Sequence, residues 1–108
     1  MKKYYSLNEK ILDNKMIIPL PKIYDYKTAA IIQKKIETIL KQKKDNQLII
    51  IFDFKNVEYM DTAGLALCIY FSNNFQEKFK ISNIPDEIRY VFDIDIETSK
   101  IKEKEIKL

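Results

Sequence analysis

Residues 57–68 of this sequence read Val-Glu-Tyr-Met-Asp-Thr-Ala-Gly-Leu-Ala-Leu-Cys. At Asp61 the segment changes from a mixed loop to a continuous apolar run, which is typical of the start of a helix. Asp61 or Thr62 can cap that helix, because a side-chain oxygen accepts hydrogen bonds from its first free amides. Ala63 and Gly64 carry almost no side chain. They either leave the helix start open to close approach by another surface or pack it tightly against a sheet.

Strand and helix patterns alternate on both sides of this segment. The run Leu48–Phe54 is apolar and β-branched, which favours a central strand covered on both faces. The expected order is strands at 4–12 and 16–20, a helix from 27 to about 43 capped by Asp25, the central strand, a loop at 55–60, a helix from 61 to about 76, a strand at 79–83 and a helix from 85 to about 92. Such alternation predicts an α/β sheet with parallel pairs and right-handed crossovers.

Taken together, these segments resemble the signature of the STAS domain family. That family includes bacterial anti-sigma factor antagonists and the cytoplasmic tails of sulfate transporters. Its pattern is an apolar strand ending in Asp, a loop with Val, then Asp, Ser or Thr, a small residue, Gly and Leu. Ile49–Phe54 corresponds to the strand, Asp53 to its acidic end, Val57 to the loop residue and Asp61–Leu65 to the turn into the helix.

The resemblance extends to residues 79–88, which are similar to the family's next strand and helix start, and covers about residues 14–94. It implies one STAS domain over residues 1–108, with a mixed four- to five-stranded sheet and helices mainly on one face. The tail from about residue 95 alternates charged residues with isolated Ile, and fits an edge strand, a frayed helix or a flexible end.

The resemblance also implies a regulatory module that binds a partner protein. In anti-sigma factor antagonists, a partner kinase phosphorylates a Ser in this turn, and phosphorylation releases the partner. Most members carry the acceptor just before the Gly, where this chain has Ala63, which has no hydroxyl. Some stress-signalling relatives use the residue just after the Asp, which is Thr62 here. The expected partner is then an anti-sigma factor kinase, with Thr62 as the phosphoacceptor.

A second interpretation is an ABC-transporter partner. Asp61–Leu67 closely resembles the STAS subunit of the bacterial Mla lipid-transport system, where the Thr and the apolar helix bind the transporter's ATPase. No phosphorylation cycle is needed there, so Ala63 is no obstacle. Genomic neighbours would separate the two interpretations.

The helix that follows the turn is apolar on every side, because residues 65–71 are all apolar. We expect one stripe to cover the sheet, made of Leu65, Cys68, Ile69 and Ser72. The others, Leu67, Tyr70 and Phe71, should face water unless the first helix or the tail covers them. Exposed apolar patches tend to be binding sites, and Tyr is favoured at interfaces. The predicted partner-binding residues are Asp61, Thr62, Ala63, Gly64, Leu67 and Tyr70.

Composition argues against catalysis and cofactors. The chain has no His, one Cys and one Gly, which removes His-based nucleophilic sites and phosphate-cradling glycine loops and argues against a zinc site. We expect Cys68 to be a small buried hydrophobe. Asp53, Glu58 and Asp61 are the only clustered carboxylates near the motif, but strand ends and caps supply acidic residues routinely. We therefore predict no enzyme activity, no metal and no cofactor.

Charge and hydropathy limit the remaining partners. The net charge is +3 and comes from lysines that are interleaved with acidic residues, whereas nucleic-acid binders concentrate positive charge. The longest apolar stretches, Leu48–Phe52 and Ala63–Phe71, fall far short of the roughly 20 residues that span a bilayer. We expect a cytoplasmic protein that neither binds nucleic acid nor inserts into a membrane.

Overall fold

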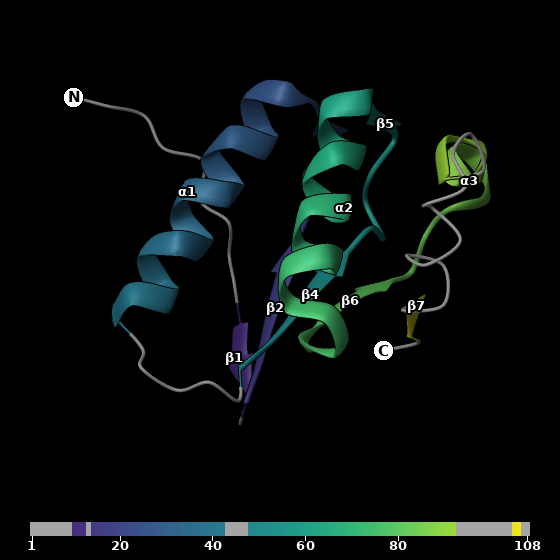
Figure 1. The fold of residues 1–108 in the computed structure, drawn as a ribbon. Helices are drawn as coiled ribbons and strands as arrows, with labels where there is room; N and C mark the ends of the chain where they lie inside the picture. The colour runs from purple at the N-terminus through teal and green to yellow at the C-terminus, as the bar shows by residue number, and fades with distance from the viewer. Residues whose placement is uncertain (1–9, 13, 43–47, 93–104, 107–108) are drawn as a thin grey trace.

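A computed structural model describes residues 10–12, 14–42, 48–92 and 105–106. Figure 1 shows the arrangement of the elements along the chain. They are β1 (Lys10–Leu12), β2 (Lys15–Pro19), β3 (Ile23–Tyr24), α1 (Tyr26–Gln42), β4 (Ile49–Asp53), β5 (Tyr59–Met60), α2 (Thr62–Phe75), a 3₁₀ turn (Gln76–Lys78), β6 (Phe79–Ser82), α3 (Asp86–Phe92) and β7 (Glu105–Ile106).

The main sheet has the strand order β1-β2-β4-β6-β7. β1 pairs antiparallel with β2, and the pairs β2–β4, β4–β6 and β6–β7 are parallel. The predicted α/β fold with a parallel sheet and three helices is therefore confirmed. A second sheet of two short parallel strands, β3 and β5, was not expected. β5 lies within the segment expected to be a loop. It was not predicted because a strand of two residues is too short to show a periodic pattern.

The helices α1 and α2 lie side by side in front of the sheet, and α3 lies beyond β6 (Figure 1). Between helices and sheet lies one apolar core, in which Phe52 of β4 is fully buried. Its ring packs edge-on against Phe71 of α2 at 5.7 Å and against Phe79 of β6 at 5.1 Å between ring centroids. Edge-to-face pairs of this kind add to the free energy gained from burial alone.

The first helix begins and packs as predicted. The Asp25 carboxylate accepts a hydrogen bond from the backbone N–H of Thr28 at 3.1 Å, which is the expected N-cap. That bond holds the pKa of Asp25 below its ordinary value. Ala29, Ile32 and Ile36 form the buried stripe of the helix.

Several expectations concern residues outside the described part of the chain. They include residues 4–9 of the first predicted strand and most of the tail from about residue 95. Within the tail, β7 pairs with β6. In the described segments, none of the helices combines the length and the apolar character that a membrane span requires.

Candidate functional site

One carboxylate joins the starts of α1 and α2. Asp61 Oδ1 accepts a hydrogen bond from the backbone N–H of Gly64 at 2.9 Å, and Oδ2 accepts one from the backbone N–H of Tyr26 at 3.0 Å. Both amides lie in first helical turns, where backbone donors have no partner within the helix and the dipole favours negative charge. Of the two predicted cap candidates, Asp61 and Thr62, Asp61 is the N-cap. Its bond to α1 was not predicted, and it holds the two helix starts side by side.

Gly64 is covered by the chain itself. A methyl group at its Cα would lie 2.8 Å from the carbonyl oxygen of Tyr24 and 3.0 Å from both Tyr24 Cδ2 and Met60 Cγ. The missing side chain therefore allows α2 to lie directly on β3. The expectation that Gly64 is open to a partner is wrong, and the tight-packing alternative describes this residue.

Beneath Gly64, two buried polar side chains face each other. The Tyr24 hydroxyl lies 4.0 Å from Cys68 Sγ. Burial raises the pKa of Cys68 to about 12 and raises that of Tyr24 well above its ordinary value. Since the thiolate is the reactive form of cysteine, Cys68 is an inert core residue, as the sequence predicted.

The outer side of α2 remains accessible. Thr62, the first residue of the helix, and Ala66 are exposed, and Ala63 is half-buried. Tyr70 follows one turn after Ala66 and is 41% exposed. Thr62, Ala66 and Tyr70 recur every four residues, so they lie on one face of the helix.

Two residues expected to face water are buried instead. Leu67 is 5% exposed and Phe71 is fully buried. Leu67 lines the groove that α2 forms with the neighbouring α1, and the Phe71 ring stacks on Phe79 at 5.9 Å between centroids. The expectation of exposure is wrong for both. The sequence alone does not show that α1 lies against this side of α2. The stripe predicted to cover the sheet is correct, because Leu65, Cys68 and Ser72 are buried and Ile69 packs against the core.

A shallow groove of about 300 Å³ runs between the two helices beside this outer face. We call it the α1–α2 groove. Four residues from each helix line it: Tyr26, Ala29, Ala30 and Gln33 from α1, and Ala63, Ala66, Leu67 and Tyr70 from α2. Four alanines therefore form much of its surface, and Tyr26, which is 60% exposed, adds a second accessible aromatic ring. The contribution of α1 was not foreseen, although Ala29 and Ala30 on an otherwise Lys-rich helix were a signal.

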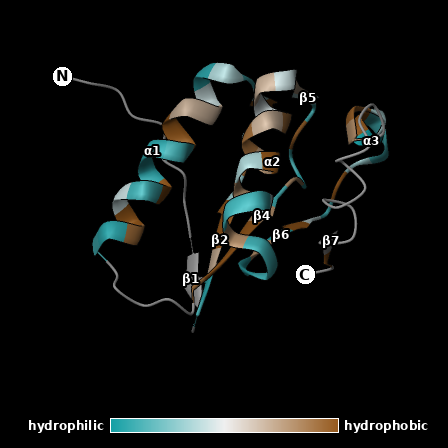
Figure 2. Cartoon of the chain, viewed as in Figure 1, coloured by the Kyte–Doolittle hydropathy of each residue, from teal (hydrophilic) through white to brown (hydrophobic). Residues whose placement is uncertain are grey.

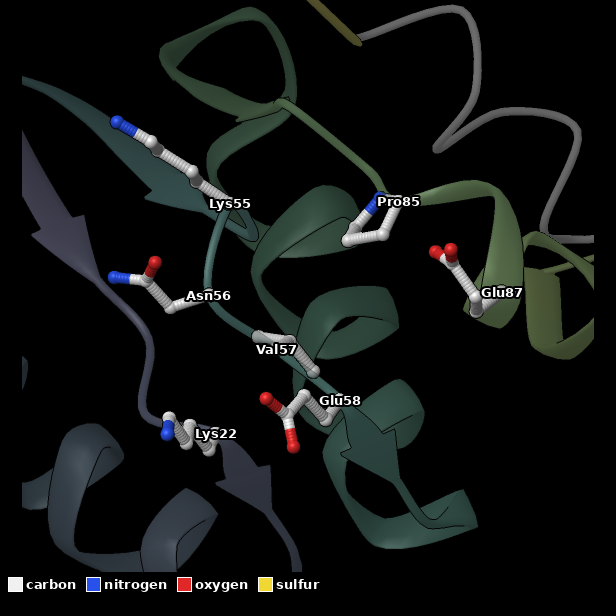
Figure 3. Close-up of a pocket in the computed structure, with 7 residues that line it drawn as sticks. All are labelled: Lys22, Lys55, Asn56, Val57, Glu58, Pro85 and Glu87. Carbon is white, nitrogen blue, oxygen red and sulfur yellow. The ribbon is translucent and has the colours of Figure 1, made fainter.

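A second hollow, of about 410 Å³, lies near the carboxyl end of β4 (Figure 3). Its charged lining residues are Lys22, Lys55, Glu58 and Glu87, all exposed and of both signs. Ligands of open α/β sheets usually bind where successive crossovers leave in opposite directions. In this sheet, β2, β4, β6 and β7 lie side by side in the same order in which they follow along the chain. The order does not reverse among these strands, so they form no switch point of the kind at which ligands usually bind.

The three carboxylates considered as catalytic candidates have separate structural places. Asp53 Oδ1 accepts hydrogen bonds from the backbone N–H of Lys55 at 3.0 Å and from the Asn83 side chain at 3.1 Å. Glu58 lines the second hollow, and Asp61 caps α2. Within the described ranges, no three acidic or Cys side chains lie together in a way that could hold a metal ion.

A mostly parallel sheet whose central strand leads through an Asp-capped turn into a covering helix is the arrangement expected of a STAS-type α/β domain. Residues 6–102 match the model of the STAS domain family. The chain belongs to that family, as the turn and its flanking segments predicted.

Solved structures with the same fold include a bacterial regulator in two states. The NMR structure of the protein TM1081 aligns with a TM-score of 0.73 and 14% identity, over 100% of this chain and 84% of that one. The phosphorylated form of the Bacillus cell fate determinant SpoIIAA aligns at 0.70 and 18%, over 95% and 91%. The unphosphorylated form of SpoIIAA, an anti-sigma factor antagonist, aligns at 0.64 and 20%, over 83% and 84%. No curated protein matches this sequence.

Proposed function

We propose that this chain is a non-enzymatic regulatory module that binds a partner protein through the start of α2 and the adjoining α1–α2 groove. The observation that carries the proposal is the accessible, uncharged surface formed by Thr62, Ala66 and Tyr70, with Tyr26 across the groove. Exposed tyrosines are typical of surfaces that bind proteins. Gly64 contributes by letting α2 lie close to β3, and Asp61 by holding the helix starts together. The cytoplasm remains the expected location.

We further propose the anti-sigma factor antagonist type of regulation, with Thr62 as the phosphoacceptor. Its fold relative SpoIIAA is known in phosphorylated and unphosphorylated forms. Thr62 is exposed at the first position of α2, so a kinase can reach its hydroxyl. A phosphate there would add about −1.5 to −2 charges. It would repel the Asp61 carboxylate and compete with it for the amides at the helix start, and either effect changes the binding surface.

The test is quantitative affinity capture from the native host, comparing the wild type with Tyr70→Asp. The matched control is Tyr90→Asp, because Tyr90 is 64% exposed on α3 and lies outside the groove. A central interface Tyr contributes about 1–4 kcal/mol. Recovery of the partner should therefore fall about tenfold or more with Tyr70→Asp and stay near the wild-type level with Tyr90→Asp. Equal recovery with all three proteins would rule out this surface.

The phosphorylation step has its own test. Incubation with the captured kinase should place a phosphate on the peptide that contains Thr62, as detected by mass spectrometry. Full phosphorylation of a Thr62→Ala variant would refute the assignment of the acceptor.

A second candidate function is binding the ATPase of a lipid-transport ABC system, as in the Mla STAS subunit, without phosphorylation. The observation that favours it is Ala63, which stands half-buried where most antagonists carry the acceptor hydroxyl. In that case the captured partner is an ATPase subunit, and its recovery falls with Thr62→Ala or Tyr70→Asp. Kinase treatment then leaves both the mass of the chain and the recovery unchanged.

A further inference from the structure

The two helices that border the groove differ in charge. α1 carries four lysines against one glutamate, whereas α2 contains no charged residue at all. Figure 2 shows the same contrast, because hydrophilic bands recur along α1 while the first half of α2 is pale to brown. The groove lining itself is uncharged, and the helix on one side of it carries a net positive charge while the helix on the other side is neutral.

Three of the four lysines of α1 lie on the helix face of Ala30 and so border the groove without lining it. Lys27 and Lys34 lie three residues before and four residues after Ala30, which lines the groove, so all three share one face of the helix. Lys41 continues the row seven residues after Lys34. All three lysines are exposed, and Lys27 Nζ lies 5.9 Å from the centroid of the Tyr26 ring.

Among the described residues, the acidic groups near this row are few, and most are engaged. The carboxylates of Asp25 and Asp61 accept backbone hydrogen bonds at the helix starts. Glu37 is exposed and accepts a hydrogen bond from the Gln33 side chain at 3.4 Å. On the α2 side, the Asn74 side chain donates to the carbonyl oxygen of Tyr70 at 2.7 Å and brings no charge.

We infer that the α1–α2 groove binds a helix of the partner protein that is apolar where it faces Ala30, Ala66 and Tyr70 and acidic where it faces Lys27 and Lys34. The inference rests on the proposed function and specifies the chemistry of the partner. Two helices that start side by side and have small residues between them offer a groove into which the side-chain ridge of a third helix packs. An acidic edge on that helix would complement the lysine row, raise the association rate and fix its orientation.

A second copy of this chain fits the groove less well. Placed groove to groove, the copies bring the lysine row of α1 opposite either the same row or the uncharged α2. Like charges repel in the first arrangement, and no opposite charge is gained in the second. A partner with its own acidic helix is therefore the occupant that the charges favour.

The experiment selects ligands from a displayed library of single helices whose outer face is randomised, using the intact chain as bait. Selected helices should combine Leu-like side chains with Glu or Asp on one edge. In NMR titrations they should shift the amide signals of Ala30, Ala66 and Tyr70. The double variant Lys27→Glu/Lys34→Glu should lower the affinity for the selected helices about tenfold at low salt and less at high salt. The control Lys55→Glu/Lys80→Glu makes the same charge change outside the groove and should leave affinity unchanged.

Four outcomes would each overturn the inference. The selection could yield neutral or basic helices or no helices at all, the shifted NMR signals could lie outside the groove, or the chain could sediment as a dimer that Ala66→Glu dissociates. Failure of the inference is distinguishable from failure of the proposed function. If capture of the native partner is lost with Tyr70→Asp but unchanged with Lys27→Glu/Lys34→Glu, the binding surface stands and the acidic helix does not. If neither variant changes capture, the surface itself is wrong.

Discussion

Replacing Gly64 by alanine tests how closely α2 lies on β3. In an ordinary helix the change would stabilise the protein by about 1 kcal/mol, because alanine is the better helix former. Here the added methyl group would lie 2.8 Å from the carbonyl oxygen of Tyr24, a backbone atom that cannot rotate away. It would also lie 3.0 Å from Met60 Cγ, which can move more easily. Inserting a methylene into a well-packed core costs about 1–3 kcal/mol.

The two effects oppose each other, and the contact with the backbone oxygen decides the sign. We expect Gly64→Ala to lower the free energy of unfolding by up to about 2 kcal/mol, the overpacking cost less the helix-propensity gain. For a domain near 100 residues, each kcal/mol corresponds to a Tm decrease of about 4–8 °C. Urea denaturation followed by circular dichroism measures the free energy, and a thermal scan measures the Tm.

Two further variants control for the helix-propensity effect. Ala66→Gly changes an exposed position of the same helix and should cost about 1 kcal/mol through propensity alone. Gly64→Ala combined with Met60→Ala should be less stable still, because Met60 is itself a buried core residue and the Tyr24 carbonyl oxygen remains in place. A gain of about 1 kcal/mol for Gly64→Ala would refute the reasoning, since it would mean that α2 stands away from β3.

Three other changes have defined outcomes. Asp61→Ala removes the acceptor of two helix-start amides and should destabilise the chain by about 1–2 kcal/mol, with NMR shifts at both Tyr26 and Gly64; a shift confined to Gly64 would contradict the bond to α1. The pKa of Asp25 is lower in the folded chain than its ordinary 3.8, so the ionised carboxylate stabilises the folded chain fully above pH 3.8, and this stabilisation is lost as the pH falls through the folded pKa. Asp25→Asn should therefore make the free energy of unfolding depend less steeply on pH in the acid range. An unchanged pH dependence would count against the cap. Cys68, with its raised pKa of about 12, should react with a thiol reagent only after unfolding, and rapid labelling of the native chain would contradict its burial.

Most of the fold could be predicted from local pattern. The helix α1 has an apolar stripe over several turns, and β4 is a long β-branched run, so tertiary context did not override either pattern. The caps at Asp25 and Asp61 were also readable, because a cap bonds to amides within its own first turn. The strands β3 and β5 escaped notice because two residues contain no repeat.

The parts that could not be predicted depend on which elements become neighbours. Leu67 looked exposed because α2 is apolar all round, and only the position of α1 shows that this side is covered. The bond from the Tyr26 amide to Asp61 joins residues 35 positions apart, and no local pattern indicates it. Gly64 was singled out correctly, but its role follows from the Tyr24 carbonyl oxygen beneath it.

The shared carboxylate of Asp61 makes the two helix starts mechanically dependent on each other. An event at the beginning of α2 that draws this side chain away would also release the first amide of α1, although α1 precedes that turn in the chain. The spacing between the tyrosine rings on opposite helices would then change together with the chemistry at the turn. The affinity of a protein that binds both helices could thus depend on a modification that it does not contact.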